Sequence, residues 1–326
     1  MISTGIAAGS NPRAQLEQHG YFVFDDVIDR DRVIQPLLEE YSQVLDQLAG
    51  DLFNEGKISQ THSELPFTDR LVQVVKESGR VPTAHFDITL PQSNIRADTP
   101  IHLGPAVFNL ITDEALLDRV EDVVGPEITV NPVQHVRLKL PMGTLEGDLD
   151  PMIGKSPWHQ DGGVFLEEAD DSDILTVWVP LSKSTLDNGC MRVVPTQRQA
   201  EILTHCPSRL RGAHIPDNQV DVTQGVPLPM SAGSLLMLHA RTLHDSLPNT
   251  TTDQVRISLD LRFQATGTPT GRPQFPSFVA RSRSHPEREL RDPAVWKQMW
   301  LNAREQLSQS APPRFHRWDP SSSVCA

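Results

Sequence analysis

The chain has 326 residues, a formal net charge of −13 and a hydrophobic content of 38%, a composition typical of a folded globular protein. The excess of acidic side chains argues against a nucleic acid as partner, because binding a phosphate backbone depends on clustered Lys and Arg. No run approaches the roughly 20 uninterrupted apolar residues that a membrane helix requires. We therefore expect a small-molecule partner, with no nucleic acid and no membrane; the oligomeric state is left open.

The start of the chain and its cysteines bear on the compartment. The first ten residues lack the basic start and apolar run of a secretory signal. The three cysteines, Cys190, Cys206 and Cys325, are odd in number and lack the spacing of metal ligands, so we interpret them as buried or surface thiols. Both observations predict a cytoplasmic location.

Residues 1–127 are predicted to be mostly helical. From Asn11 to Gly50, a helical pattern is interrupted by the apolar run at 21–24, which predicts a strand between two helices. A further amphipathic helix is predicted from Asp113 to Val124, with Thr112 or Asp113 as its cap.

After residue 127, short β-rich runs alternate with Gly, Pro, Asn and Asp, as in an antiparallel barrel or sandwich. Six strands are predicted, at 128–140, 174–181, 191–194, 219–223, 234–239 and 256–264. We expect a mainly β fold with flanking helices, in which residues 128–265 form a jelly-roll barrel. Residues 266–326 are expected to form an extension with a helix at 293–308, and the whole chain, 1–326, a single domain.

His159-Gln160-Asp161 has the His-x-Asp spacing of a metal site. On a strand both side chains would lie on one face, because side chains alternate with period two. A second histidine from a distant strand would complete the two-His, one-carboxylate set that leaves three positions on iron(II) open for oxygen and a co-substrate. The spacing alone is weak evidence, and His85-Phe86-Asp87 has it too.

The choice between the two motifs depends on residues further along the chain. His244 is followed by Arg256, at the head of a predicted strand. A fixed cation near the third ligand can bind the far carboxylate of a dicarboxylic co-substrate through two parallel hydrogen bonds. His239 competes with His244, but it ends an apolar run further from Arg256. We therefore predict His159, Asp161 and His244 as the metal ligands and catalytic centre.

The strand that begins at Arg256 carries polar residues on one face and apolar residues on the other. An ordinary interpretation sends the charged face to solvent. In a barrel that encloses a metal and a charged co-substrate, the inner face can be polar while helices cover the apolar one. We expect Arg256 to point inward.

Together these residues resemble the phytanoyl-CoA dioxygenase family of iron(II)- and 2-oxoglutarate-dependent oxygenases. The resemblance runs from about His19 to Gln264. It is carried by His19-Gly20-Tyr21-Phe22-Val23, Pro157-Trp158-His159-Gln160-Asp161, Thr176-Val177-Trp178-Val179-Pro180-Leu181, Asp187-Asn188-Gly189-Cys190-Met191 and His244-Asp245-Ser246-Leu247-Pro248-Asn249. It implies a double-stranded β-helix, a cupin-like jelly roll, with iron near its mouth, 2-oxoglutarate as co-substrate and O2 as oxidant.

The resemblance also implies roles for individual residues. His159, Asp161 and His244 match the iron ligands, and Arg256 and Ser246 match the residues that hold the distal carboxylate of 2-oxoglutarate.

Two further residues match positions near the family's site. Gln134 matches a polar residue that often touches the co-substrate, and Trp178 lies where an aromatic residue often borders the site. For Trp178 a purely structural role in the core is an equal alternative.

The implied reaction is oxidation, most simply hydroxylation, of an unactivated carbon, with release of succinate and CO2. Asp161 favours hydroxylation over halogenation, because related halogenases have a small residue there. The alternatives are an acyl-CoA 2-hydroxylase, a cupin-like metal-dependent isomerase or hydrolase with three histidines, and a non-catalytic binding protein on the same fold.

The substrate prediction depends on three segments expected at the mouth, 85–90, 101–109 and 143–154, the last being either a lid or a plain loop. Their neighbourhood offers Phe86, Ile88, Ile101, Leu103, Phe108 and Met142 but no cluster of Lys or Arg. We therefore expect a largely apolar molecule of secondary metabolism, bound free and not as a CoA thioester. Four arginines are the alternative source of a CoA site: Arg192, Arg198, Arg209 and Arg211.

Overall fold

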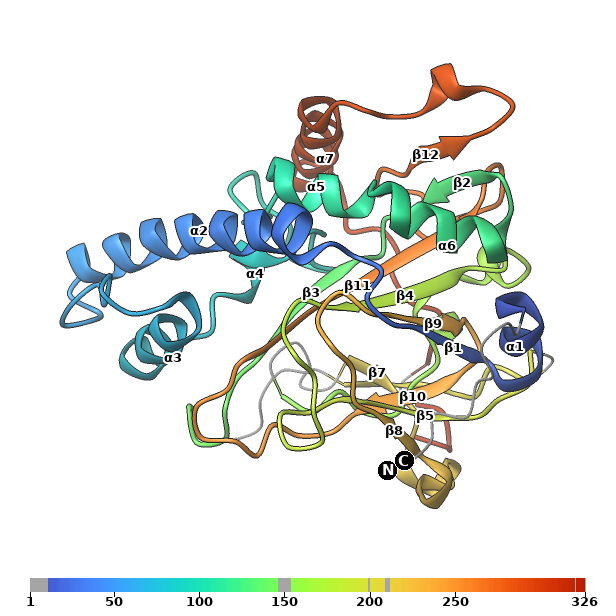
Figure 1. Cartoon of the computed structure of the whole chain (residues 1–326), viewed down its shortest axis with the longest axis horizontal. Coiled ribbons are helices and arrows are strands. Elements are labelled where there is room, and N and C mark those ends of the chain that lie inside the picture. The colour runs from blue at the N-terminus through green and yellow to red at the C-terminus, as the bar shows by residue number, and fades with distance from the viewer. Residues whose placement is uncertain (1–10, 146–153, 199, 209–211, 320, 326) are drawn as a thin grey trace.

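A computed structural model describes residues 11–145, 154–198, 200–208, 212–319 and 321–325 (Figure 1). Its helices are α1 (Pro12–His19), α2 (Gln35–Asn54), α3 (Phe67–Ser78), α4 (Thr83–Phe86), α5 (Pro105–Ile111), α6 (Glu114–Val124) and α7 (Pro293–Ser308). Its strands are β1 (Tyr21–Phe24), β2 (Glu127–Val130), β3 (His135–Lys139), β4 (Leu175–Pro180), β5 (Met191–Val194), β6 (Cys206–Ser208), β7 (Gly212–His214), β8 (Val226–Leu228), β9 (Leu235–His239), β10 (Leu243–Ser246), β11 (Arg256–Ala265) and β12 (Phe278–Ser282).

The strands form two main antiparallel sheets. The larger has the order β1-β9-β4-β11-β2-β12, with β3 also paired to β11, and the smaller has the order β10-β5-β8. Figure 1 shows α5, α6 and α7 on one side of the larger sheet and β5, β8 and β10 on the other. The predicted mainly β fold with flanking helices is confirmed. The strand pairings of the described residues leave two separate sheets, so closure into a jelly-roll barrel stays a prediction.

Strand β11 has an apolar face and a polar face, and both are buried. Its apolar side chains belong to the main core beneath the helices: Ile257, Leu259, Leu261 and Phe263. Its polar side chains are buried on the opposite face, in the space between the sheets: Arg256, Ser258, Asp260 and Arg262. The prediction that Arg256 points inward is therefore confirmed.

Several predicted elements are present, and local chemistry explains their ends. Asp113 caps α6 by accepting hydrogen bonds from the first-turn N–H groups of Ala115 and Leu116. Helix α7 has the predicted bounds and buries Trp296 and Trp300 on one face. The strand at 21–24 is β1, between α1 and α2.

Other predicted strands are interrupted or absent. The run 128–140 is split into β2 and β3, because the side chain of Asn131 accepts the N–H of Val133 and makes a turn next to Pro132. The strand predicted at 219–223 is wrong. That segment forms short 3-10 turns, one of them capped by the side chain of Asp221.

The interpretation of all three cysteines as thiols is wrong. Cys206 and Cys325 form a disulfide across 119 residues, with Cα atoms 5.4 Å apart, whereas Cys190 is a free buried thiol. Spacing in the sequence did not reveal the pair, because the C-terminal tail must first fold back onto β6. Disulfides are uncommon in a reducing cytosol, so the cysteines no longer support the predicted cytoplasmic location.

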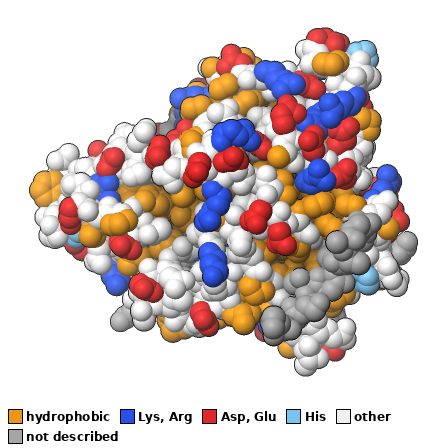
Figure 2. All heavy atoms as spheres, viewed as in Figure 1, with side chains coloured by type: hydrophobic (Ala, Val, Ile, Leu, Met, Phe, Trp, Pro, Cys, Tyr) orange, Lys and Arg blue, Asp and Glu red, His pale blue; other side chains and the backbone are white. Residues whose placement is uncertain are grey.

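The exterior is consistent with the composition. No helix among the described residues is long and apolar enough to cross a membrane. On the face shown in Figure 2, Lys and Arg side chains lie interspersed with Asp and Glu and form no continuous basic area.

The covered face of β11 gives a stability prediction. Leu261 is fully buried beneath the helices, so Leu261→Ala should lower the free energy of unfolding by about 2 to 5 kcal/mol in urea denaturation. Val295→Ala, at a position 47% exposed on α7, is the control and should change it by less than about 0.5 kcal/mol. Equal losses for both variants would contradict the described packing.

Candidate active site

Three side chains singled out by the sequence, His159, Asp161 and His244, converge in the interior. Their potential ligand atoms all lie within 4.8 Å of one another. The Nε2 atoms of the two histidines each lie 3.9 Å from a different carboxylate oxygen of Asp161, and the imidazole rings are 4.1 Å apart. Across the described residues, no other group of three or more His, Cys, Asp or Glu side chains is arranged to share a metal ion.

Backbone carbonyls fix how the two imidazoles face Asp161. Nδ1 of His159 lies 2.9 Å from the carbonyl oxygen of Pro157, and Nδ1 of His244 lies 2.9 Å from that of Thr242. A carbonyl only accepts, so each Nδ1 donates its proton and each Nε2 keeps a lone pair. Burial and the neighbouring His244 lower the pKa of His159 to about 3, so this ring is neutral at physiological pH. His159 therefore already has the form that binds a metal.

Asp161 is completely buried, and each carboxylate oxygen has a protein partner. Nη2 of Arg262 donates to Oδ1 at 2.5 Å, and the hydroxyl of Thr176 donates to Oδ2. Burial alone would raise the pKa of Asp161, but the charge of Arg262, the two histidines and the Thr176 hydrogen bond outweigh it and hold this pKa well below its usual range. The carboxylate is therefore ionised and fixed in orientation.

The backbone conformation that brings His159 and Asp161 together differs from the predicted strand. The sequence analysis placed His159 and Asp161 on one face of a strand. Instead, His159 pairs with His244 through two backbone hydrogen bonds of 3.0 Å in an isolated bridge. Asp161 then begins a 3-10 turn, Asp161–Val164, called here the ligand turn. The carboxylate reaches the histidines because the backbone turns, not because side chains alternate.

The competing candidates lie elsewhere. In the second motif, His85-Phe86-Asp87, the phenyl ring is fully buried in the core. The carboxylate of Asp87 accepts the N–H of Val136 at 3.0 Å and lies 3.0 Å from Nδ1 of His135. His239 accepts the N–H of Arg241 through Nδ1, outside the three-residue group. The sequence-based preference for His159 and His244 agrees with this geometry.

A second cluster, called here the anion pocket, consists of Arg256, Lys139, Ser246 and Trp178. Arg256 is fully buried, and its guanidinium lies 5.3 Å from the centroid of the Trp178 ring. Its Nη1 donates to Ser258 at 2.7 Å, whereas its Nε has no hydrogen-bond partner. Burial lowers the pKa of Arg256 to about 10, which keeps it protonated at neutral pH. No carboxylate of the described chain is close enough to form an ion pair with it.

Lys139 lies opposite Arg256 in the register of β3 and β11. Its Nζ donates to the hydroxyl of Ser246 and to the carbonyl of Leu247, both at 2.6 Å. Burial, followed by the charges of Arg256 and Arg137, lowers the pKa of Lys139 well below its usual range. Two buried cationic groups without a matching anion are unfavourable. The pocket therefore fits a carboxylate supplied by a ligand.

The residues predicted for the co-substrate are only partly brought together. Ser246 follows His244 by two residues on β10 and so shares its face. Trp178 is buried, as a structural role in the core requires, and it also borders Arg256, as a role at the site requires. Gln134 is buried just before β3, and its Nε2 donates to the carbonyl of Asn131 at 3.0 Å.

Sequence analysis missed Lys139, Arg262 and Thr176 as site residues. The pattern did contain a signal for Lys139, because polar and apolar residues alternate along β3 as they do along β11. For Thr176 there was none: its place follows from the register that sets it opposite Arg262.

The predicted apolar mouth is wrong for most of its residues. Phe86, Ile88 and Phe108 belong to the main core, because the short helices that carry Phe86 and Phe108 turn their apolar faces inward. Met142 is 60% exposed. Most of segment 143–154, predicted as a lid or loop, lies outside the described residues.

The alternative CoA site loses two of its arginines. Arg192 donates to both oxygens of Asp245, one of them at 2.8 Å. Arg198 forms an ion pair with Asp173. Arg209 and Arg211 lie outside the described residues.

The family model for "Phytanoyl-CoA dioxygenase (PhyH)" matches residues 16–258. The match covers well over half of the chain and includes all three converging residues and Arg256. The chain belongs to the phytanoyl-CoA dioxygenase family, whose members are iron- and 2-oxoglutarate-dependent oxidoreductases. The resemblance seen in the sequence is confirmed.

One curated relative is the probable alpha-ketoglutarate-dependent hypophosphite dioxygenase of Stutzerimonas stutzeri, 26% identical over 172 residues that make up 50% of this chain and 55% of that protein. The chain thus spans about half the length of that relative. Among solved structures, the non-heme monooxygenase ThoJ is similar in its apo form, with a TM-score of 0.52 and 17% identity over 91% of this chain and 98% of that one. Its nickel complex gives a TM-score of 0.51 and 16% identity over 89% and 93%. These two likenesses show the fold.

The converging residues give a metal-binding prediction. His159→Ala and Asp161→Ala should each abolish retention of iron(II), because each removes one of three protein ligands. His85→Ala, which alters the second His-x-Asp motif, is the control and should retain the wild-type metal content. Metal analysis after anaerobic loading and desalting measures this, and loss of iron in His85→Ala but not in His159→Ala would show the assignment to be wrong.

Proposed function

We propose that the protein is an iron(II)- and 2-oxoglutarate-dependent dioxygenase that hydroxylates an unactivated carbon of a small molecule. One observation carries the proposal: a cluster of two histidines and a carboxylate, His159, His244 and Asp161, lies in the same interior as a buried arginine, Arg256, that lacks an anionic partner. A metal site alone would not need Arg256. A cupin-like isomerase or a binding protein on this fold would leave that buried charge unexplained.

The donor set fits iron(II). Two imidazole Nε2 atoms and one carboxylate are the ligands expected of a facial triad with open positions. When bound there, iron supplies the oxidising chemistry, with O2 as oxidant and 2-oxoglutarate as the reductant that leaves as succinate and CO2. Around it, Arg262 and Thr176 keep the Asp161 carboxylate in one orientation.

The anion pocket fits the distal carboxylate of 2-oxoglutarate. Arg256 and Lys139 would share the negative charge, and Ser246, now the acceptor of the Lys139 ammonium, has a hydroxyl proton to donate. The Trp178 ring beneath the guanidinium excludes water from one side. Gln134 stays a prediction as a further contact to the co-substrate.

Two finer features belong to the same proposal. Asp161 occupies the position that would have to be vacant for a halide ligand, which favours hydroxylation over halogenation. We propose that the two sheets are the halves of a double-stranded β-helix in one domain; β1 from the N-terminal part and β12 from the C-terminal part join the larger sheet, which supports a single unit.

The substrate class, a largely apolar molecule of secondary metabolism, stays a prediction, and most of the residues that motivated it lie in the core. The engagement of Arg192 and Arg198 in ion pairs supports a free substrate over a CoA thioester. Titration of the iron-loaded, oxygen-free protein with CoA tests the alternative. Saturable micromolar binding that is lost in an Arg209→Ala/Arg211→Ala variant would favour an acyl-CoA hydroxylase.

The reaction class is tested by succinate formation. With iron(II), ascorbate and O2, the protein should convert 2-oxoglutarate to succinate, because uncoupled turnover needs no primary substrate. Asp161→Ala protein at the same iron concentration is the control and should form none. Equal succinate from both proteins would contradict the proposed site.

The co-substrate pocket gives a separate prediction. Removing one partner of a desolvated charge pair costs about 2 to 5 kcal/mol, so Arg256→Met should raise the 2-oxoglutarate concentration needed for half-saturation about 30-fold or more. Lys139→Met should act in the same direction, and both variants should retain iron. Arg198→Met, which changes an arginine outside the pocket, is the control. An unchanged 2-oxoglutarate requirement in Arg256→Met would contradict the assignment.

A further inference from the structure

The ligand turn is contacted by a segment that the proposed function does not use, the C-terminal tail at residues 314–319 and 321–325. The tail lies beyond the residues that the family model matches. Nη2 of Arg317 donates to the carbonyl of Gly162 at 2.5 Å, and Nε1 of Trp318 donates to that of Gly163 at 2.5 Å. These are the two residues that directly follow Asp161.

Arg317 is held in place on its other side. Its guanidinium also donates to the carbonyl of Phe165 at 3.1 Å and to both oxygens of Asp170 at 2.6 and 2.8 Å. The side chain is 9% exposed, so these hydrogen bonds are largely shielded from water. One arginine therefore joins the beginning of the ligand turn to the segment that follows it.

His205 also holds the chain at the start of the turn, through the N–H of Gln160. Its Nδ1 donates to the carbonyl of Leu203 at 2.8 Å, which leaves Nε2 to accept the N–H of Gln160 at 3.0 Å. Gly163 allows this approach, because a Cβ there would lie 2.2 Å from the imidazole ring. Trp318 stacks on the same ring, with centroids 5.1 Å apart and planes at 23°. The ligand turn and the residue before it are thus contacted by both the His205 segment and the tail, and these two segments also contact each other.

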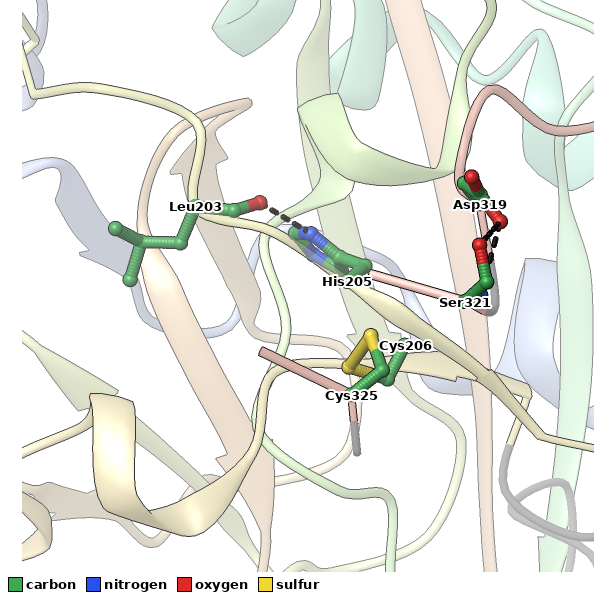
Figure 3. The surroundings of a disulfide bond; sticks show 6 residues. All are labelled: Leu203, His205, Cys206, Asp319, Ser321 and Cys325. Carbon is green, nitrogen blue, oxygen red and sulfur yellow. Dashed lines mark hydrogen bonds between the residues drawn. A yellow bond between two sulfur atoms is a disulfide. The ribbon is translucent and has the colours of Figure 1, made fainter. Parts of the chain in front are cut away.

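The disulfide joins these two supports covalently. Cys206 directly follows His205, and Cys325 ends the described part of the tail (Figure 3). The tail near it is ordered locally by Ser321, which donates to Asp319 at 2.7 Å. Without the bond, only non-covalent contacts would keep Trp318 and Arg317 against the turn.

We infer that Arg317 and Trp318 are positioning residues for the turn that carries Asp161, and that the Cys206–Cys325 disulfide retains them there. The inference rests on the proposed metal site. Groups that orient a metal ligand typically change metal affinity about 10- to 100-fold when they are lost. The tail acts on the backbone of Asp161's neighbours, so its effect is on the placement of the carboxylate.

The test compares an Arg317→Met/Trp318→Phe variant with wild type. The double substitution removes the donors to Gly162 and Gly163 but keeps an aromatic ring on His205. Arg314→Met is the matched control, because Arg314 is a tail arginine whose ion pair with Glu167 is exposed. Two properties are measured: hydrogen exchange of the Gln160, Gly162 and Gly163 amides in metal-free protein, and titration with Co(II) alone, followed by its visible absorption.

The double variant should exchange these amides about tenfold faster or more, with a similar rise in the Co(II) dissociation constant and an altered visible spectrum. Exchange in α7 reports folding and should be unchanged. Cys325→Ser should shift both measurements in the same direction. Arg314→Met should match wild type.

Unchanged exchange of the turn in the double variant would overturn the inference, and so would an unchanged Co(II) affinity and spectrum. A Cys325→Ser protein identical to wild type in both measurements would overturn the role of the disulfide. Wild-type protein that binds no Co(II) would instead contradict the proposed metal site, and the exchange comparison would still decide whether the tail holds the turn.

Discussion

The interior depends on one constraint: charged side chains that are buried away from water need partners of opposite charge. Between the sheets, buried ionised side chains lie beside an apolar cluster that includes Trp178, Val193 and Leu236. Arg262 compensates Asp161 at 2.5 Å, and Arg137 compensates Asp260 at 2.5 Å. The pairing is possible because β11 carries its charges on one face and a continuous apolar row on the other, which the helices cover.

Arg256 and Lys139 are two buried basic groups of this interior for which the described residues offer no ion-pair partner. A dianionic co-substrate would supply the missing charge, and its distal carboxylate would reach side chains that are already buried. The protein contributes little chemistry of its own in this arrangement. Its contribution is to keep polar groups aimed at positions where a metal and an anion are stable.

The sequence was most informative where a residue pattern is compatible with only one arrangement of the side chains. Alternation along β11 correctly predicted that Arg256 is buried. The position of Arg256 after His244 led to the choice of His159, Asp161 and His244 over the motif at His85, and these three residues converge. It was least informative where a contact depends on the fold of distant segments. Thr176 reaches Asp161 through strand register, and Cys206 meets Cys325 only after the tail has folded back onto β6.

The wrong predictions have the same origin. Apolar residues such as Phe86 and Phe108 were expected near a ligand because their segments, 85–90 and 101–109, were predicted to form the mouth of the site. In the structure those segments are short helices, and burying their apolar side chains against the core is the larger gain in free energy. His159 and Asp161 were expected on one face of a strand, but the His-x-Asp spacing does not specify the backbone conformation that brings the two side chains together.

The disulfide also divides the chain into two topologically different parts. The covalent loop from Cys206 to Cys325 contains His244, Arg256 and Arg262, whereas His159 and Asp161 lie before it. Closing a loop of this size removes unfolded-state freedom worth about 4 to 5 kcal/mol in the chain-entropy model. A single cut within the loop would leave both fragments covalently joined, so the two sources of metal ligands would stay on one molecule.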